Sequence, residues 1–266
     1  RDTARTWELG RRRSVSPHDG LGANLVVQVY KNRVMRVVPF ENEAVNECWI
    51  SDRDRFSYEG LNAADRLVRP MIRSGGRGAS GTWLEVDWEE ALAVVAEGLK
   101  KARGPGLGAL VSPHATLEEM FLAQKLVRGL GSENVDFRLR QTDFAADGRR
   151  KGAPWLGMAV AEIATLDRVL LVGSFLRKDH PLLANRFRQA AKRGQQVNVL
   201  HVADDDLALA VANRAVVRPS ELPAALGAVV RALAEEKGAA VPPALARLAV
   251  SDAARSTHSR SDGRYS

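Results

Sequence analysis

From residue 87 onward, short apolar stretches alternate with amphipathic ones, and this alternation narrows the choice of fold more than any other feature. Residues 168–172 (RVLLV) and 196–202 (QVNVLHV) have the apolar or β-branched character of buried strands, whereas residues 88–101 and 116–129 repeat apolar positions at helical spacing. Strands that alternate with helices pair in parallel, because each helix carries the chain back along the sheet. The sequence therefore predicts an α/β domain with a parallel sheet.

Capping signals predict where the helices of this domain begin and end. A side chain that accepts a hydrogen bond from the first turn marks a start, and glycine marks an end. Further short strands are expected at residues 108–112 and 134–137. The expected helix signals are Asp87 with Glu90, Thr116 with Glu119, Pro181 at a first turn with Gly194 at the end, and Ser220 as the N-cap of a helix over residues 220–237.

The first part of the chain has a different pattern. Residues 24–30 and 33–38 are rich in β-branched residues, and Lys31 and Asn32 separate them, so a β-hairpin is predicted. After residue 250 the composition turns to Ser, Arg and Asp, which is typical of disorder. The expected domains are a small β-rich domain over residues 1–73, the α/β domain over 74–250 and a disordered tail over 251–266.

Composition excludes some classes of protein. The 266 residues are 45% hydrophobic, which is enough for a packed core. The net charge of +7 favours an acidic partner, but apart from residues 11–13 (RRR) the basic residues alternate with acidic ones, so we expect no nucleic-acid partner. No apolar run approaches the roughly 18 residues of a membrane span, and no direct span is expected. Because the chain begins with Arg1, we interpret it as a fragment.

The single cysteine limits metal chemistry. Iron-sulfur clusters and structural zinc sites need several thiolates, and this chain has only Cys48. Trp49 and Ile50 follow it, which favours a small core side chain over a reactive thiol. The five histidines lie too far apart for a local zinc motif, and we expect each to be structural: His18, His114, His180, His201 and His258.

Three segments have patterns found in ligand sites, but each has a simpler interpretation. Residues 74–81 are rich in glycine, yet they lead into an extended piece rather than the helix that phosphate binding requires. Residues 204–206 (DDD) are ligands that hard cations prefer, but they also suit a helix start. Residues 171–175 (LVGSF) end a strand without the G-x-G-x-x-G spacing. We therefore predict no catalytic, cofactor-binding or metal-binding residue in this chain.

Residues 43–61 (EAVNECWISDRDRFSYEGL) carry a distinctive resemblance. They resemble the G-type (75 kDa) large iron-sulfur subunit of respiratory complex I, NADH:quinone oxidoreductase, in a form typical of proteobacteria. The similarity extends to about residue 250. It also includes residues 6–9 (TWEL), 14–15 (SV), 22–27 (GANLVV), 33–39 (RVMRVVP), 86–92 (VDWEEAL), 170–174 (LLVGS), 180–182 (HPL) and 185–186 (NR).

This large iron-sulfur subunit resembles the molybdopterin oxidoreductases here, which implies their α/β fold: a small β-rich N-terminal domain and a parallel-sheet domain that is incomplete in this chain. In those relatives, three cysteines near the first hairpin and a fourth before an Asp-Arg-x-Arg-Phe segment hold a four-iron cluster. Residues 14–25 contain no cysteine, and Ser51 stands where the fourth would be. The resemblance therefore implies no cluster and no molybdenum in this chain.

The resemblance also implies a setting. The 2Fe-2S and 4Fe-4S clusters of the full-length polypeptide would lie before Arg1, and its partners would be the NADH- and flavin-binding subunit and other subunits of the peripheral arm, on the cytoplasmic side of the inner membrane. We expect this chain to be a non-catalytic scaffold within the proton-translocating NADH:ubiquinone oxidoreductase. The alternatives are an active molybdenum or tungsten pterin oxidoreductase similar to formate dehydrogenase, and a basic nucleic-acid-binding protein.

Overall fold

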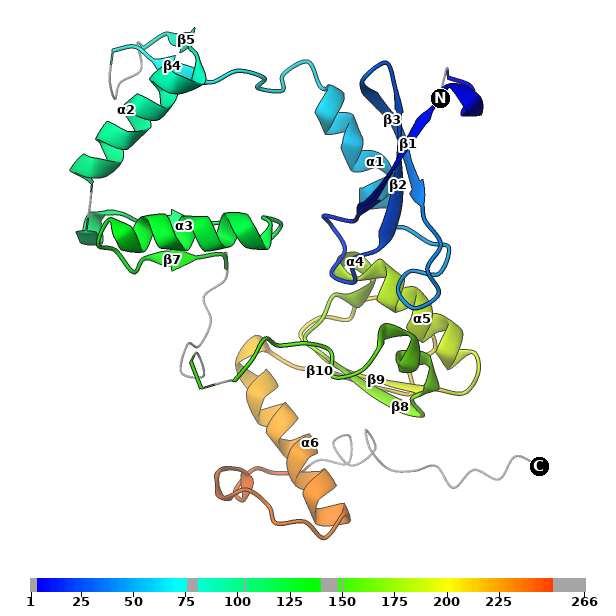
Figure 1. The fold of residues 1–266 in the computed structure, drawn as a ribbon. Coiled ribbons are helices and arrows are strands. Elements are labelled where there is room, and N and C mark those ends of the chain that lie inside the picture. The colour runs from blue at the N-terminus through cyan, green and yellow to red at the C-terminus, as the bar shows by residue number, and fades with distance from the viewer. Residues whose placement is uncertain (1–3, 76–80, 103, 140–147, 150, 251–266) are drawn as a thin grey trace. The chain divides into compact units, whose positions relative to one another are not determined.

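The computed structural model describes residues 4–75, 81–102, 104–139, 148–149 and 151–250. The chain divides into two units, of which the first combines Arg1–Tyr58 with Trp155–Ser266 and the second is Glu59–Pro154. Figure 1 shows the elements of both units in chain order. The expected tail over residues 251–266 lies outside the described residues, and the predicted domain boundaries stay a prediction.

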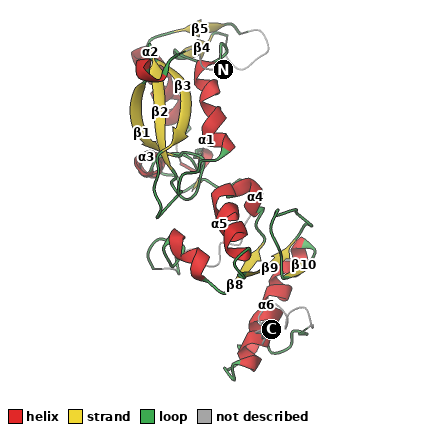
Figure 2. Ribbon diagram, turned by 90° about the vertical axis from the view of Figure 1, so that its right-hand side faces the viewer, coloured by secondary structure: helices red, strands yellow, loops and turns green. Residues whose placement is uncertain are grey.

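The first unit begins with an antiparallel sheet of three strands in the order β1-β2-β3, which Figure 2 shows side by side. The predicted hairpin of β2 and β3 is confirmed, and its turn at Lys31 and Asn32 has positive φ values of 46° and 61°, as primed hairpin turns require. The strand β1 was not predicted, because three consecutive arginines conceal its pattern. The strands are β1 (Gly10–Val15), β2 (Asn24–Tyr30) and β3 (Arg33–Pro39).

The arginines of β1 do not form one patch on the sheet. Successive side chains of a strand point to opposite faces, so Arg12 faces away from its two neighbours. The guanidinium of Arg13 lies over the ring of Phe40, 4.4 Å from the ring centroid. Leu25 and Val37 of this sheet form a small buried core with Ile50. The short helix α1 (Asp52–Phe56) contacts β3.

The second sheet of the first unit is parallel, with the strand order β10-β9-β8. The central strand β9 is buried at five consecutive positions, Val197 to His201, so both of its faces are covered. In Figures 1 and 2, α5 and α6 lie on opposite sides of this sheet. The strands are β8 (Arg168–Val172), β9 (Gln196–His201) and β10 (Asn213–Val216), and the helices are α4 (Leu176–Asp179), α5 (Pro181–Ala191) and α6 (Leu222–Glu236).

Two expectations for this sheet need correction. The sequence predicts β8 as a fully buried strand, but its residues are half-buried and Val172 is exposed, because β8 is an edge strand of the described sheet. Ser220 does not cap α6, since a 3-10 turn precedes the helix and Glu221 occupies the N-cap position without a side-chain bond. The start of α5 at Pro181 and the left-handed Gly194 (φ 103°) after its end agree with the prediction.

The second unit opens with a hairpin, β4 (Met71–Arg73) and β5 (Trp83–Glu85). The glycine-rich segment joins these two antiparallel strands, so it does not lead from a strand into a helix as a phosphate cradle does; its residues 76–80 lie outside the described residues. Helix α2 (Trp88–Lys101) follows, and Oδ1 of Asp87 accepts the predicted capping bond from the N–H of Glu90 at 2.9 Å.

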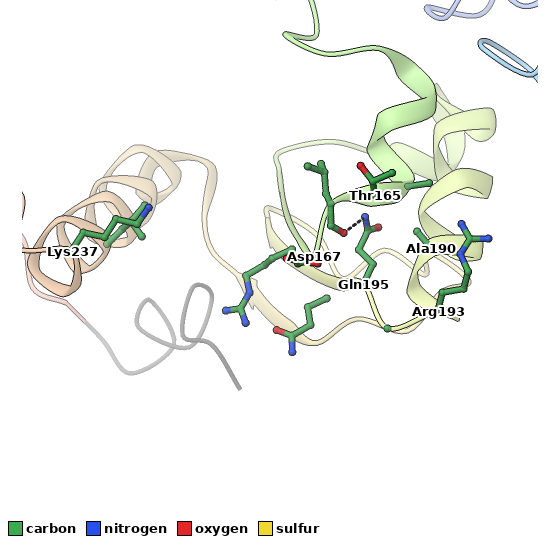
Figure 3. Close-up of a pocket in the computed structure, with 12 residues that line it drawn as sticks. Thr165, Asp167, Ala190, Arg193, Gln195 and Lys237 are labelled. Atoms are coloured by element: carbon green, nitrogen blue, oxygen red, sulfur yellow. Dashed lines mark hydrogen bonds between the residues drawn. The ribbon is translucent and has the colours of Figure 1, made fainter. Parts of the chain in front are cut away.

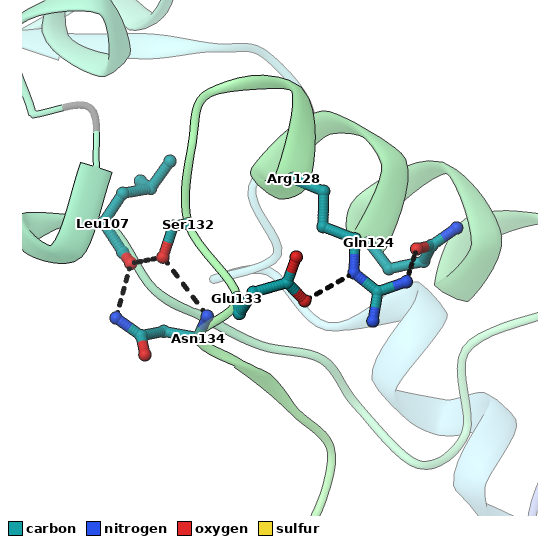
Figure 4. Close-up of polar contacts among 6 residues, drawn as sticks. All are labelled: Leu107, Gln124, Arg128, Ser132, Glu133 and Asn134. Atoms are coloured by element: carbon teal, nitrogen blue, oxygen red, sulfur yellow. Dashed lines mark hydrogen bonds and ion pairs between the residues drawn. The ribbon is translucent and has the colours of Figure 1, made fainter. Parts of the chain in front are cut away.

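The second unit continues with a two-stranded parallel sheet and one helix, β6 (Ala109–Leu110), α3 (Leu117–Gly129) and β7 (Val135–Asp136). The predicted capping box of Thr116 and Glu119 is present in both directions. Figure 4 shows the hydrogen bonds that hold the turn after α3. Ser132 Oγ donates to the carbonyl of Leu107 at 2.6 Å, and the Asn134 N–H donates to Ser132 Oγ at 3.2 Å.

Short 3-10 helices complete the secondary structure of both units. In the part of the chain that the structure describes, no helix has the length and apolar character needed to cross a membrane. The 3-10 helices are η1 (Thr6–Glu8), η2 (Ser57–Asn62), η3 (Gly104–Gly106), η4 (Val160–Thr165), η5 (Pro219–Glu221) and η6 (Pro243–Leu245).

Candidate functional site

The loop between β1 and β2 meets the start of α1 in a buried network of two hydroxyls and one carboxylate. Ser16 Oγ donates to Oδ1 of Asp54 at 2.6 Å, and Ser51 Oγ donates to Oδ2 of the same carboxylate at 2.9 Å. All three side chains are buried, and that of Asp54 is only 2% exposed. Each oxygen of the buried carboxylate therefore has a hydroxyl partner, which offsets the cost of removing the group from water.

Backbone groups hold the two serines in place. Ser51 is the N-cap of α1, and its Oγ accepts the N–H of Asp54 at 3.2 Å. Ser16 Oγ accepts the N–H of His18 at 3.1 Å and of Asp19 at 2.9 Å, a local turn that serine favours. Each hydroxyl thus both donates and accepts, so the network connects the loop firmly to α1.

Asp19 lies in the same loop, close to His180. Its Oδ1 accepts the N–H of Leu21 at 3.0 Å, whereas its buried Oδ2 has no partner among the described residues. Burial raises the pKa of the Asp19 carboxyl above its usual 3.8. The hydrogen bond from the Leu21 N–H lowers this pKa in part, the nearby charge of Asp54 raises it further, and the nearby charge of His180 lowers it. The fold therefore disfavours the ionised form of Asp19.

We expect Asp19→Asn to raise the free energy of unfolding at pH 7 by about 1 kcal/mol, because it removes a buried charge with an unpaired oxygen. A carboxyl with a raised pKa contributes stability below its unfolded pKa and loses that contribution as pH rises through the folded pKa. The gain should therefore be small near pH 3.5 and grow toward neutral pH in urea unfolding curves.

The control for this prediction is Asp52→Asn, since the Asp52 side chain is 90% exposed on the adjoining helix. Its effect should stay within about 0.5 kcal/mol at both pH values. A stability gain for Asp19→Asn that is equally large at pH 3.5 and pH 7 would contradict a raised pKa.

The prediction that Cys48 is a core side chain is wrong, because this residue is exposed. Asn46 explains the difference. Its buried amide group donates to the carbonyls of Phe40 at 3.2 Å and of Trp49 at 3.1 Å. These bonds turn the loop so that Ile50 enters the core while Cys48 and Trp49 stay outside.

The histidines are dispersed across the first and second units. Among the described residues, no group of three or more His, Cys, Asp or Glu side chains is placed to hold a metal ion. His18 Nε2 lies 2.7 Å from Ser57 Oγ, His114 is exposed before α3, His180 adjoins Asp19, His201 is buried with its ring centroid 4.5 Å from that of Phe175, and His258 lies outside the described residues.

The carboxyl ends of the parallel strands carry the acidic run at residues 204–206. Asp204 pairs with Arg214, and Asp206 accepts bonds from Arg177 and from the N–H of Ala208. No helix starts here, because the run lies in the loop between β9 and β10, so the interpretation as a helix start is wrong. Internal ion pairs account for two of the three carboxylates.

A cavity of about 590 Å³, shown in Figure 3, opens at the amino ends of β8 and β9, away from the acidic run. Buried Gln195 is one of its lining residues, and the Nε2 of Gln195 donates to the carbonyls of Ile163 and Leu166, both at 2.8 Å. Arg193 and Lys237 line it just after α5 and α6. Cations at helix C-termini stabilise the helix dipole, so these two charges have a structural role there.

Comparison with known proteins places this geometry in a family. Residues 66–235, more than half of the chain, match molybdopterin oxidoreductase. The chain belongs to the molybdopterin oxidoreductase family. In addition, residues 9–59 match the NADH-ubiquinone oxidoreductase NDSU1/NuoG-like 4Fe-4S domain. That match includes the Ser16, Ser51 and Asp54 network.

Curated relatives confirm the resemblance carried by residues 43–61. The G-type subunit of the NADH-quinone oxidoreductase from Rickettsia felis is 34% identical over 191 residues, which are 72% of this chain and 27% of that protein. Its counterpart from Rickettsia conorii is 36% identical over 183 residues, 69% of this chain and 26% of that protein. The probable oxidoreductase YjgC of Bacillus subtilis is 32% identical over 213 residues, which are 77% of this chain and 21% of that protein. The chain spans about a quarter of these relatives' length.

A solved structure supports the predicted α/β fold. Acetylene hydratase from Pelobacter acetylenicus has a TM-score of 0.60 with this chain at 16% sequence identity, over 85% of this chain and 32% of that protein. At this identity the likeness concerns the fold alone.

The residues of the matched 4Fe-4S domain do not supply the thiolates of such a cluster. Iron-sulfur clusters are held by cysteine thiolates, whereas Ser51, where the resemblance places a cysteine, has a hydroxyl that bonds to the carboxylate of Asp54. The single cysteine, Cys48, is exposed on a different loop.

Proposed function

We propose that this chain is the scaffold region of the G-type large iron-sulfur subunit of an NADH-quinone oxidoreductase. In this proposal the chain itself holds no cluster and carries out no chemical step. It supports electron transfer from NADH to quinone through 2Fe-2S and 4Fe-4S clusters in other parts of the same polypeptide. Its partners are other subunits of the peripheral arm, including the NADH- and flavin-binding subunit, on the cytoplasmic face of the inner membrane.

The observation that carries this proposal is the Ser16, Ser51 and Asp54 network. A vacant cluster site would leave buried polar groups without partners, at a cost of about 1–3 kcal/mol for each group. Here the two hydroxyls and both carboxylate oxygens are paired. Side-chain hydrogen bonds therefore hold the loop and α1 together at Ser51, where the resemblance places a cluster ligand in cysteine-bearing relatives.

Metal analysis tests the proposal. We expect the chain, purified without oxygen, to contain far less iron and acid-labile sulfide than the four of each per chain that one 4Fe-4S cluster would add. After reduction it should show no cluster signal by electron paramagnetic resonance. Incubation with iron and sulfide should leave this unchanged, because hydroxyls cannot replace thiolates as ligands. A stoichiometric cluster in this chain would overturn the proposal.

A molybdenum or tungsten pterin oxidoreductase is the second candidate. One observation favours it: both ring nitrogens of His201 and Oδ2 of Asp205 are buried without partners among the described residues. They lie at the carboxyl ends of parallel strands, where open α/β sheets bind ligands. Stoichiometric molybdenum or tungsten in the same analysis would support this candidate, and a value near zero would reject it.

A further inference from the structure

The cavity at the amino ends of β8 and β9 involves two buried polar atoms that have no partner among the described residues. They are Nη1 of Arg168 and Oε1 of Gln195, and both residues line the cavity. All the lining residues belong to the first unit, so one unit forms the cavity. A buried polar group without a partner is costly, which indicates that a molecule from outside these residues completes the site.

The orientation of the Gln195 amide is fixed by its own hydrogen bonds. Its Nε2 donates to the carbonyls of Ile163 and Leu166, and Figure 3 shows the bond to Leu166 as a dashed line. Because only the amide nitrogen can donate to a carbonyl, the atom left over is the oxygen. Gln195 is only 8% exposed. Its Oε1 therefore requires a donor such as a hydroxyl, whereas Nη1 of Arg168 requires an acceptor.

The charges of the cavity narrow the choice of acceptor. Its lining carries three cations, Arg168, Arg193 and Lys237, and one carboxylate, Asp167. None of these cations forms an ion pair with another described residue. The C-terminal ends of α5 and α6 contribute about half a negative charge each. Roughly one positive charge remains, which favours a ligand with a single negative charge.

We propose that this cavity binds a small hydroxycarboxylate, a molecule with one carboxylate and at least one hydroxyl group. Its carboxylate accepts a charge-assisted hydrogen bond from the guanidinium of Arg168, and a hydroxyl donates to Oε1 of Gln195. The volume of about 590 Å³ lies within the range of ligand cavities, so an organic acid of several carbons fits. Water alone would pair the two atoms but would leave the positive charge without a counterion.

This site is distinct from the ligand position that the α/β fold offers. Open α/β sheets bind ligands at the carboxyl ends of their strands, where His201 and Asp205 lie. The cavity lies at the amino ends of the same strands, at Arg168 and Gln196. Binding there is therefore independent of the scaffold role proposed above, and the failure of one leaves the other standing.

Three compounds with carbon chains of the same length separate the two groups that the proposal requires. Gluconate carries a carboxylate and hydroxyls, glucitol carries only hydroxyls, and hexanoate carries only a carboxylate. Titration of each into this chain at pH 7, followed by the amide NMR shifts of the residues that line the cavity, measures binding. We expect gluconate to bind about tenfold more tightly than either of the other two, because only gluconate pairs both buried atoms.

Substitutions then locate the bound carboxylate. Arg168→Met should weaken gluconate binding by about tenfold or more, because it removes the charged donor. Arg188→Met is the matched control, since Arg188 is exposed on α5 outside the cavity and the variant loses the same charge; it should leave the affinity unchanged. Lys237→Met alters an exposed residue on which folding does not depend, and it should weaken binding about threefold through charge alone. If Arg168→Met does not fold, Lys237→Met decides together with the three compounds.

Three results would overturn the proposal. Equal affinity for gluconate and hexanoate would show that the cations attract any anion without a site for the hydroxyl. Gluconate binding that Arg168→Met and Lys237→Met leave at the wild-type level would place the carboxylate elsewhere on the protein. The absence of any shift at millimolar gluconate would mean that water fills the cavity.

Discussion

Replacing Arg186 by Met is expected to lower the free energy of unfolding of the first unit by about 3 kcal/mol. Arg186 is buried on α5, and its Nη2 donates to the carbonyls of Glu43 and Val45, each at 2.9 Å. Its Nη1 lies 3.1 Å from Oε1 of Glu47. Methionine fills a similar volume but leaves two carbonyls and a carboxylate without their donor, and that loss dominates the effect.

Urea unfolding followed by circular dichroism measures the loss, and hydrogen exchange over residues 42–50 locates it. Arg188→Met is the matched control, because Arg188 is exposed on the same helix, and its effect should stay within about 0.5 kcal/mol. A similarly small effect for Arg186→Met would show that water or another donor replaces the guanidinium. The loop over residues 42–50 would then not depend on α5.

Local signals in the sequence predicted much of the α/β fold. Asp87 and Thr116 mark helix starts through hydrogen bonds within one turn, and Pro181 marks one through its fixed φ, so their effect can be read from neighbouring residues. The hairpin turn at Lys31 and Asn32 is equally local. The strand β10 was missed because residues 213–216 (NRAV) have no continuous apolar character, and the strand forms by pairing with β9.

The candidate site could be predicted only in part. Ser51 stood out because the resemblance places a cysteine there. The other serine of the network, Ser16, could not be identified, since its bond to Asp54 spans 38 residues. The contact of Arg186 with Glu43 spans 143 residues. Such pairs depend on how whole elements pack, which neither periodicity nor composition encodes. The error at Cys48 is related, because Asn46, whose Oδ1 accepts the N–H of Asn24 over 22 residues, holds the turn that leaves Cys48 outside.

Asp54→Ala is the second substitution with a large expected effect, a loss of about 3 kcal/mol in the free energy of unfolding. Two charge-assisted hydrogen bonds from Ser16 and Ser51 disappear, each worth about 1.5–3 kcal/mol, and two buried hydroxyls lose their acceptor. Urea unfolding measures the loss, and Asp52→Ala, on the exposed side of the same helix, is the control.

A double-mutant cycle shows whether the network acts as one unit. Once Asp54 is alanine, Ser16→Ala should cost less than it does in the wild-type protein, because its acceptor is already gone, and the coupling should reach about 1 kcal/mol. Additive losses would contradict the cooperative network. If the coupling is present in iron-free protein, hydrogen bonds alone fasten the β1–β2 loop to α1, which is the physical condition for a scaffold that keeps its fold without a cluster.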